Sequence, residues 1–227
     1  HYRRAKARLF EELLRPVGGL PRALACADDP SWEGLSLPAD TWLYGFSPAA
    51  QLRITELRAA GSGMALALAT PLGRTTFQSA LVGRFNALNL TAALGVCLLL
   101  GFGLEESAAA LERVDCVPGR MEVVKHGGDF LVLVDYAHSP DALCCVLQAA
   151  QEVCPGQLWV VFGCGGDRDA GKRPQMGCVA EEWADQVVVT SDNPRNEAPL
   201  QIIDSILSGM SISPAHVDVD RESAIRW

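Results

Sequence analysis

Short apolar runs and amphipathic stretches alternate along the second half of the chain. Apolar runs that predict strands cover residues 130–134, 158–162 and 186–190, and a further run starts at 217–219. Stretches that predict helices follow the first three runs, over residues 140–153, 174–184 and 199–207. Continuous apolar strands that alternate with helices are typical of a parallel sheet covered on both faces. We therefore predict an α/β domain with a mainly parallel sheet in this half.

The first half of the chain has a different pattern. It predicts an amphipathic helix over residues 2–14 and a short strand over 23–27. Glycine, proline and serine then separate four predicted strands, TWLYGF, QLRITELRA, GMALALAT and RTTFQSAL. Two predicted helices follow, over residues 87–100 and 105–113. The pattern changes around Pro118, which predicts two domains, residues 1–117 and 118–227.

Composition and charge limit the possible classes of function. Hydrophobic residues make up 49% of the 227 residues and charged residues 20%, the balance of a soluble globular protein. The net charge of −8 gives no electrostatic support for binding nucleic acid or a membrane surface. The apolar stretch 87–104 is nearly long enough to span a bilayer. Its asparagine, threonine and glycine residues favour a buried helix instead.

The eight cysteines include no CxxC pair, so neither a zinc ribbon nor a thioredoxin-like site is predicted. Most have apolar neighbours, where a free thiol behaves as a small hydrophobic side chain. No basic segment leads into an apolar stretch and a cleavage site, as it would in a signal peptide. These features predict reduced cysteines in a cytoplasmic protein.

A polar motif follows each of the first three predicted strands of the second half. The first motif is DYAHSPD, residues 135–141. Asp135 closes the strand and His138 lies in the loop that follows. Ser139 is suited to cap the next helix, and Pro140 to its first turn. Taken alone, the motif fits a capped helix start with a solvated histidine as well as it fits a functional loop.

The second motif is GCGGDRD, residues 163–169. Glycines after a strand allow backbone N–H groups to turn toward an anion. Arg168, Lys172 and Arg173 are candidates to bind a carboxylate or a phosphate. Residues 166–172 also match G-x-x-x-x-G-K, but Arg173 stands where a P-loop needs serine or threonine for Mg²⁺. We therefore reject a P-loop at this position.

The third motif is DNPRNE, residues 192–197. Pro194 stiffens the loop, and Arg195 offers a planar fork of donors suited to a carboxylate. Asp192 and Asn193 can accept hydrogen bonds from an ammonium group. The alternative is a polar turn with Arg195 in a surface ion pair. Ligands bind beyond the carboxyl ends of parallel strands, so three such loops together predict a binding site for an amino acid.

These motifs together resemble the Mur ligase family. The matching segments occur in the family's order and are listed here: KARLF around Lys6, ADDP at Asp28, GRFNALN at 83–89, PGRME at 118–122, DYAHSPD, GCGGDRDAGKRP and DNPRNE. Each is weak alone, but the set is highly specific. DNPR resembles the diaminopimelate-adding members in particular, whereas lysine-adding members usually depart from it. One departure is Cys26, where the family often has asparagine.

The resemblance implies a fold and a domain organisation. Residues 1–117 correspond to part of the central, P-loop-type ATP-binding domain, with its P-loop upstream of His1. Residues 118–227 correspond to the C-terminal Rossmann-like domain, with a GKGHE-like segment after Trp227. The chain is thus expected to be the C-terminal half of a longer ligase, and we predict that it does not hydrolyse ATP by itself.

The resemblance also implies roles for individual residues. Lys6 and His138 are the catalytic candidates, with Lys6 carbamylated so that its oxygens help to hold Mg²⁺. The ATP-binding candidates are Asn86 and Asn89 near the adenine, and Arg120, Asp135 and His138 from the second domain. The candidates for contact with diaminopimelate are Arg168, Asp192, Asn193, Pro194 and Arg195.

The activity that the resemblance implies is an ATP-dependent ligation. A monomeric enzyme would add meso-diaminopimelate to UDP-MurNAc-L-Ala-D-Glu in the cytoplasm through an acyl phosphate, for peptidoglycan synthesis. Its partners would be these small molecules and ATP, with no nucleic acid and no membrane. Three alternatives stay open: a lysine-adding enzyme, a related ligase that adds glutamate to a folate, and a non-catalytic structural subunit. DNPR and GGDRD argue against the folate ligase.

Overall fold

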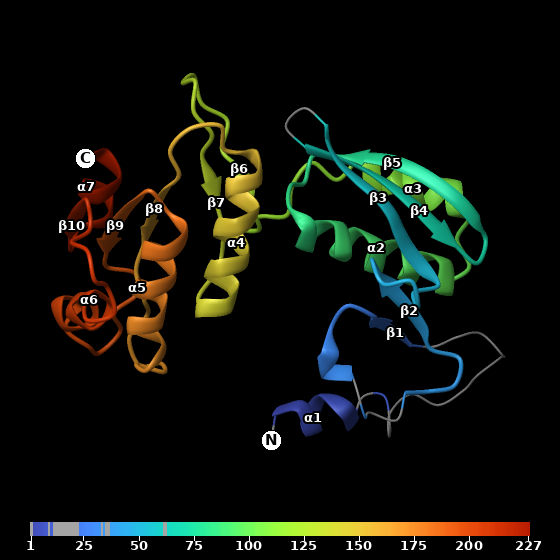
Figure 1. The fold of residues 1–227 in the computed structure, drawn as a ribbon, viewed down its shortest axis with the longest axis horizontal. Helices are drawn as coiled ribbons and strands as arrows, with labels where there is room; N and C mark the ends of the chain where they lie inside the picture. Colours follow the sequence, from blue (N-terminus) through green and yellow to red (C-terminus); the bar gives the residue numbers. More distant parts are fainter. Residues whose placement is uncertain (1, 9, 11–22, 33, 35–36, 61–62) are drawn as a thin grey trace. The chain divides into compact units, whose positions relative to one another are not determined.

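The computed structural model describes residues 2–8, 10, 23–32, 34, 37–60 and 63–227 (Figure 1). The chain divides into two compact units, His1–Pro118 and Gly119–Trp227. We call them unit 1 and unit 2 and describe each by itself. Among the described residues, no helix is long and apolar enough to cross a membrane.

Unit 1 is built on a mixed five-stranded sheet. Its strands follow in the order β1 (Leu24–Cys26), β2 (Trp42–Gly45), β3 (Leu52–Ala60), β4 (Gly63–Thr70) and β5 (Gly73–Ser79). The first three strands pair in parallel, and β4 pairs antiparallel with both β3 and β5. These strands confirm the five that the sequence predicts in this half. Of the predicted first helix, α1 (Tyr2–Arg8) is described, and residues 11–14 lie outside the described residues.

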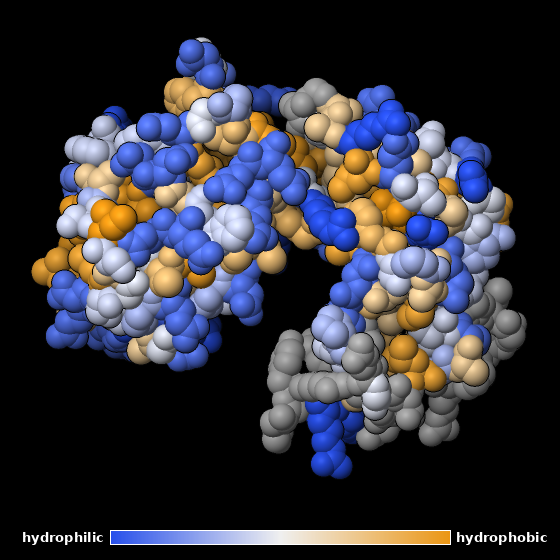
Figure 2. Space-filling model, in the orientation of Figure 1, coloured by the Kyte–Doolittle hydropathy of each residue, from blue (hydrophilic) through white to orange (hydrophobic). Residues whose placement is uncertain are grey.

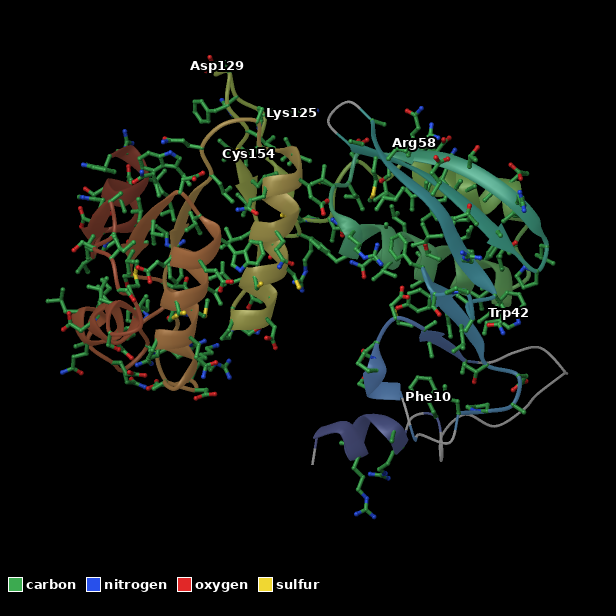
Figure 3. The ribbon with its side chains drawn as sticks, viewed as in Figure 1. Phe10, Trp42, Arg58, Lys125, Asp129 and Cys154 are labelled. Carbon is green, nitrogen blue, oxygen red and sulfur yellow. The ribbon has the colours of Figure 1, made fainter. Side chains whose placement is uncertain are left out.

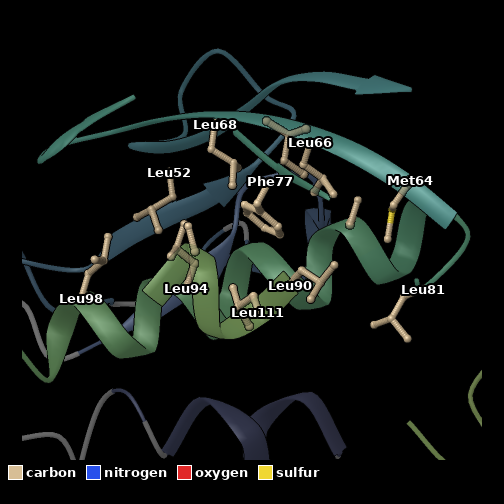
Figure 4. Close-up of a cluster of buried hydrophobic side chains, with 13 residues drawn as sticks. Leu52, Met64, Leu66, Leu68, Phe77, Leu81, Leu90, Leu94, Leu98 and Leu111 are labelled. Carbon is tan, nitrogen blue, oxygen red and sulfur yellow. The ribbon is translucent and has the colours of Figure 1, made fainter. Parts of the chain in front are cut away.

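Two helices, α2 (Arg84–Leu99) and α3 (Leu104–Glu112), enclose the core of unit 1 against the sheet (Figure 4). Leu66 and Leu68 alternate with outward residues on β4, as a strand with one buried face requires. Opposite them, α2 buries Leu90 and Leu94, which confirms the predicted buried helix. Each fully buried leucine contributes about 1.5–3 kcal/mol of hydrophobic stabilisation.

Unit 2 contains a three-stranded parallel sheet in the order β10 (His216–Asp218), β9 (Gln186–Thr190), β8 (Trp159–Phe162). Four helices accompany it: α4 (Pro140–Val153), α5 (Lys172–Trp183), α6 (Pro199–Leu207) and α7 (Arg221–Arg226). The central strand β9 is the most buried, and its valines pack with isoleucines of α6. On the face seen in Figure 2, the helices of unit 2 present mostly hydrophilic residues with scattered apolar ones between them.

One predicted strand is wrong in length and in pairing. Residues 130–134 were predicted as the first strand of the parallel sheet, but only β7 (Leu133–Val134) forms there. It pairs antiparallel with β6 (Glu122–Val123) in a separate sheet. Phe130 is 66% exposed and lies against His126 in the loop between the two strands, so this apolar run is not a core strand. Figure 3 shows Lys125 and Asp129 in the same projecting loop.

Candidate functional site

Two loops meet at the carboxyl ends of β8 and β9. We call residues 163–171 the glycine loop and residues 191–198 the Arg195 loop. A Cβ atom on Gly163 would lie 2.2 Å from the carbonyl oxygen of Thr190, and one on Gly166 would lie 1.9 Å from that of Pro194. Only glycine permits so close an approach of two backbones. The glycines therefore allow the two loops to pack side by side.

Hydrogen bonds join the two loops in both directions. The backbone N–H of Gly166 donates to the carbonyl oxygen of Asn193 at 2.8 Å. In return, Arg195 Nη1 donates to the carbonyl oxygen of Gly166 at 2.5 Å. Asn196 Nδ2 donates to Asp167 Oδ2 at 2.6 Å. The two loops therefore form one hydrogen-bonded unit.

An ion pair between a buried arginine and a half-buried glutamate adds to these contacts. Arg173 is only 4% exposed, and its Nη1 and Nη2 donate to the two carboxylate oxygens of Glu197 at 2.9 and 2.7 Å. Hydrogen bonds from Arg173 and from the backbone N–H of Asp167 lower the pKa of the Glu197 carboxyl. The hydrogen bond with Glu197 in turn raises the pKa of Arg173. The sequence-based suggestion that Arg173 binds a substrate anion is corrected, because both ends of its guanidinium already bind Glu197.

The predicted diaminopimelate contacts all lie on these two loops. Arg168 is exposed on the glycine loop, and Asp192, Asn193 and Arg195 are exposed on the Arg195 loop, with Pro194 half-buried between them. The structure thus brings the five predicted residues to one edge of the sheet. What they bind stays a prediction.

Sequence reasoning missed a further cation beside this group. Arg221, the first residue of α7, donates from Nε to the carbonyl oxygen of Ser191 at 3.0 Å. Its Nη2 lies 3.8 Å from Asp192 Oδ1. Asp220 caps α7 by accepting from the N–H of Ser223. That aspartate, next to the predicted strand, was the available signal for this helix start.

The DYAHSPD motif lies at the start of α4. Asp135 accepts two backbone N–H bonds at 2.8 Å, from Met121 to Oδ2 and from Ala137 to Oδ1. Ser139 caps α4 by accepting from Ala142 N at 3.3 Å, which confirms the predicted cap. The carboxylate of Asp135 thus fixes the loop, and each oxygen keeps a lone pair for a further donor.

The side chain of His138 is exposed, and a hydrogen bond to its backbone carbonyl holds the residue in place. Lys172 Nζ donates to its carbonyl oxygen at 2.5 Å, which ties this motif to the start of α5. His138 Nδ1 lies 3.0 Å from the carbonyl oxygen of Tyr136. A carbonyl only accepts, so this contact requires a hydrogen on Nδ1 and leaves Nε2 for a ligand. Arg120 is exposed and lies 5.7 Å from the centre of the Tyr136 ring.

In unit 1, the carboxyl ends of β1 and β2 meet the start of α2. The Asp28 carboxylate accepts from the N–H groups of Phe46 and Ser47 at 2.6 and 2.8 Å. The Arg84 guanidinium carbon lies 3.4 Å from the centre of the Phe46 ring. Residues 27–30, 45–48 and 83–86 therefore form one connected group.

The two predicted adenine-contacting asparagines differ in their surroundings. Asn86 is 2% exposed and donates from Nδ2 to the carbonyl oxygen of Val82 at 2.9 Å. Asn89 is exposed and donates to Asn86 Oδ1 at 3.3 Å. Asn86 thus holds the first turn of α2, and Asn89 is the member of the pair that a ligand can reach.

Lys6 belongs to α1, but its side chain lies outside the described part of the chain. Among the described residues, no group of three or more His, Cys, Asp or Glu side chains is arranged to hold a metal ion. The role of Lys6 in holding Mg²⁺ stays a prediction.

Comparisons with known proteins match the chain in two parts. Residues 1–97 match the model of the Mur ligase middle domain, and residues 119–227 match that of the Mur ligase glutamate ligase domain. Two curated UDP-N-acetylmuramoyl-L-alanyl-D-glutamate–2,6-diaminopimelate ligases, from Gloeobacter violaceus and Thermosynechococcus vestitus, are each 47% identical to the chain. Each alignment covers 99% of this chain and 46% of the relative. The chain thus spans about half the length of these curated relatives.

Two solved structures are similar to the chain. A structure of a UDP-N-acetylmuramoyl-L-alanyl-D-glutamate–2,6-diaminopimelate ligase is similar with a TM-score of 0.60 and 37% identity, over 99% of this chain and 47% of that one. Folylpolyglutamate synthase from Mycobacterium tuberculosis has a TM-score of 0.69 but only 19% identity, over 82% of this chain and 41% of that one. The second likeness concerns the fold alone.

Proposed function

The chain belongs to the Mur ligase family, and on that premise we propose that it forms the middle and C-terminal parts of a diaminopimelate-adding ligase. The full enzyme joins meso-diaminopimelate to the free carboxylate of UDP-MurNAc-L-Ala-D-Glu at the expense of ATP. The names of the two relatives that are 47% identical support this substrate choice. A cytoplasmic, monomeric enzyme is part of the same proposal.

The observation that carries the proposal is the Arg195 loop. Arg195 donates from Nη1 to the carbonyl oxygen of Gly166 in the glycine loop. Its side chain is exposed, so the other N–H groups of the guanidinium are available to a substrate carboxylate. Asp192 and Asn193 present acceptors from the same loop. Arg221 lies near Asp192, but an exposed pair at 3.8 Å is weak and leaves the carboxylate able to bind an ammonium group.

This combination of groups suits diaminopimelate better than lysine. Each end of diaminopimelate carries an ammonium group and a carboxylate, whereas the side chain of lysine ends in an ammonium group alone. A site with a fixed guanidinium and an acidic group on one loop can bind both charges of one end. Lysine has no carboxylate at that end, so it would forgo the charge-assisted hydrogen bonds that the guanidinium offers to diaminopimelate.

The mechanism that we propose leaves little acid–base chemistry to the protein. ATP supplies the phosphoryl group that activates the dipeptide carboxylate as an acyl phosphate. The neutral diaminopimelate amine then attacks the acyl carbon, phosphate leaves, and the nitrogen releases one proton to solvent as the amide forms. Arg195, Asp192 and Arg168 hold the amino acid in register for this attack. Positioning of this kind accounts for a large part of such a barrier reduction.

Side chains of both units are assigned to ATP in the same proposal. Arg120, Asp135 and His138 bind it from unit 2, and the fixed carboxylate of Asp135 and the free Nε2 of His138 support this role. Asn89 approaches the adenine with Asn86 behind it. Lys6, as a carbamate, would help to hold Mg²⁺, and the ion would neutralise phosphate charge.

The test uses the full-length ligase and follows ADP release with UDP-MurNAc-dipeptide, with diaminopimelate and lysine offered in parallel. We expect release with diaminopimelate only. Arg195→Ala should lower kcat/KM for diaminopimelate roughly 10- to 100-fold, the loss expected for a charged hydrogen bond. Arg226→Ala, on the exposed α7 pair with Glu222, is the matched control and should change nothing. Release with lysine would overturn the substrate assignment, and no release with either would favour a non-catalytic subunit.

A further inference from the structure

Glu197 lies where three donors from two other segments converge. Its Oε1 accepts from Arg173 Nη2 at 2.7 Å and from the backbone N–H of Asp167 at 2.6 Å. Its Oε2 accepts from Arg173 Nη1 at 2.9 Å. This one carboxylate therefore connects α5, the glycine loop and the Arg195 loop.

Arg173 anchors this junction, since its hydrogen bonds to Glu197 are shorter than its contact with a nearby backbone carbonyl. It is 4% exposed and also reaches the carbonyl oxygen of Gly165 at 3.4 Å. A buried guanidinium that loses its carboxylate partner strongly destabilises the folded protein. Separating Arg173 from Glu197 is therefore energetically unfavourable. The pair consequently fixes where the Arg195 loop stands relative to the body of unit 2.

The backbone near the pair adopts conformations that need external support. Asp167 and Arg195 have φ angles of 51° and 49°, the left-handed region that non-glycine residues rarely adopt. Each is held from the opposite loop: Asp167 through its N–H on Glu197, and Arg195 through its side chain on Gly166. Such conformations persist where the surroundings over-determine them, and here the surroundings are the other loop.

We propose that Arg173 and Glu197 are positioning residues that set the affinity for the amino-acid substrate by fixing the orientation of Arg195. The inference rests on the proposed function, since it gives Arg195 the task of binding a substrate carboxylate. Neither positioning residue touches the substrate in this scheme. Their effect reaches it through Asp167, Gly166 and the backbone of the Arg195 loop.

The test is steady-state kinetics of the full-length ligase with Glu197→Gln. The amide keeps the size of the side chain but places an N–H₂ group against the donors of Arg173. We expect KM for diaminopimelate to rise roughly 10- to 100-fold, the penalty of a small misplacement of a binding group. The KM values for ATP and for the UDP-dipeptide should stay within about twofold of wild type, as should kcat at saturating diaminopimelate.

Two further variants separate positioning from a general loss of structure. Arg173→Met removes the charge, whereas Arg173→Lys keeps it without the fork, so the lysine variant should recover part of the affinity for diaminopimelate that the methionine variant loses. Glu222→Gln removes one partner of the exposed Arg226 pair in α7 and serves as the control, with all three KM values unchanged.

A general loss of structure would raise all three KM values together or leave only the melting temperature changed, and either result overturns the proposal. An unchanged KM for diaminopimelate in Glu197→Gln overturns it as well. If Glu197→Gln does not fold, the comparison of Arg173→Lys with Arg173→Met decides in the same way. Wild-type enzyme without amino-acid-dependent ADP release refutes the proposed function itself, whereas a working wild type with unshifted variants refutes only the pair.

Discussion

Replacing Gly166 by alanine tests the contact between the glycine loop and the Arg195 loop. The new Cβ would lie 1.9 Å from the carbonyl oxygen of Pro194 and 2.6 Å from its carbonyl carbon. Real Cβ contacts essentially never fall below 3.0 Å, so the loops must separate by at least about 1.1 Å. Both opposing atoms belong to the backbone, so no change of rotamer relieves the clash.

Such a separation breaks the hydrogen bonds that join the loops. The bond from Gly166 N to Asn193 O is 2.8 Å long and would stretch well beyond hydrogen-bonding distance. The bond from Arg195 Nη1 to Gly166 O is displaced with it. We expect the free energy of unfolding to fall by about 1–3 kcal/mol, the cost of one or two lost bonds. The KM for diaminopimelate should rise roughly 10- to 100-fold because Arg195 moves.

Urea unfolding and ADP-release kinetics of the full-length ligase measure the two effects. Gly156→Ala is the matched control, because a Cβ there meets nothing within 4 Å. A KM for diaminopimelate within about twofold of wild type in Gly166→Ala would refute the reasoning. It would mean that the loops can separate without moving the group that binds the amino acid.

Three further predictions concern stability and reactivity. Ile206→Ala truncates a side chain that is 0% exposed and should lower the free energy of unfolding in urea by about 2–5 kcal/mol, whereas a loss below about 1 kcal/mol would show that the core closes over the gap. Arg173 lowers the pKa of Glu197, so the pair stabilises the fold above the unfolded glutamate pKa of about 4.3 and loses that effect as the pH falls through the folded value. The melting-temperature difference between wild type and Glu197→Gln should therefore shrink on acidification from about pH 6 to about pH 3, and a constant difference would contradict the assignment. Burial raises the pKa of the Cys164 thiol, so at pH 8 it should be alkylated more slowly than the exposed Cys178 when peptides are followed by mass spectrometry, and equal rates would contradict this.

Local signals were sufficient for most elements of unit 2. The apolar run Gln186–Thr190 is bounded by polar residues and has one consistent interpretation, a buried strand. The predicted bounds of α4 and α6 agree with the structure, since proline occupies the first turn of each helix and Ser139 caps α4. The prediction for residues 130–134 was wrong because an apolar run does not specify its partner strand, and here the partner is β6 in a separate antiparallel sheet.

The same distinction between local sequence signals and tertiary contacts applies to the candidate site. The sequence by itself determined which chemical groups are present: glycines that let backbones meet, and an arginine and an aspartate in one loop. It could not determine that Arg173 and Glu197, which are 24 residues apart, form an ion pair, or that Arg221 lies next to Asp192. Those partners depend on how α5, α7 and β9 pack together. A contact between distant residues follows from the whole arrangement of the sheet and helices, so only the tertiary structure decided which charged side chains are left to bind a substrate.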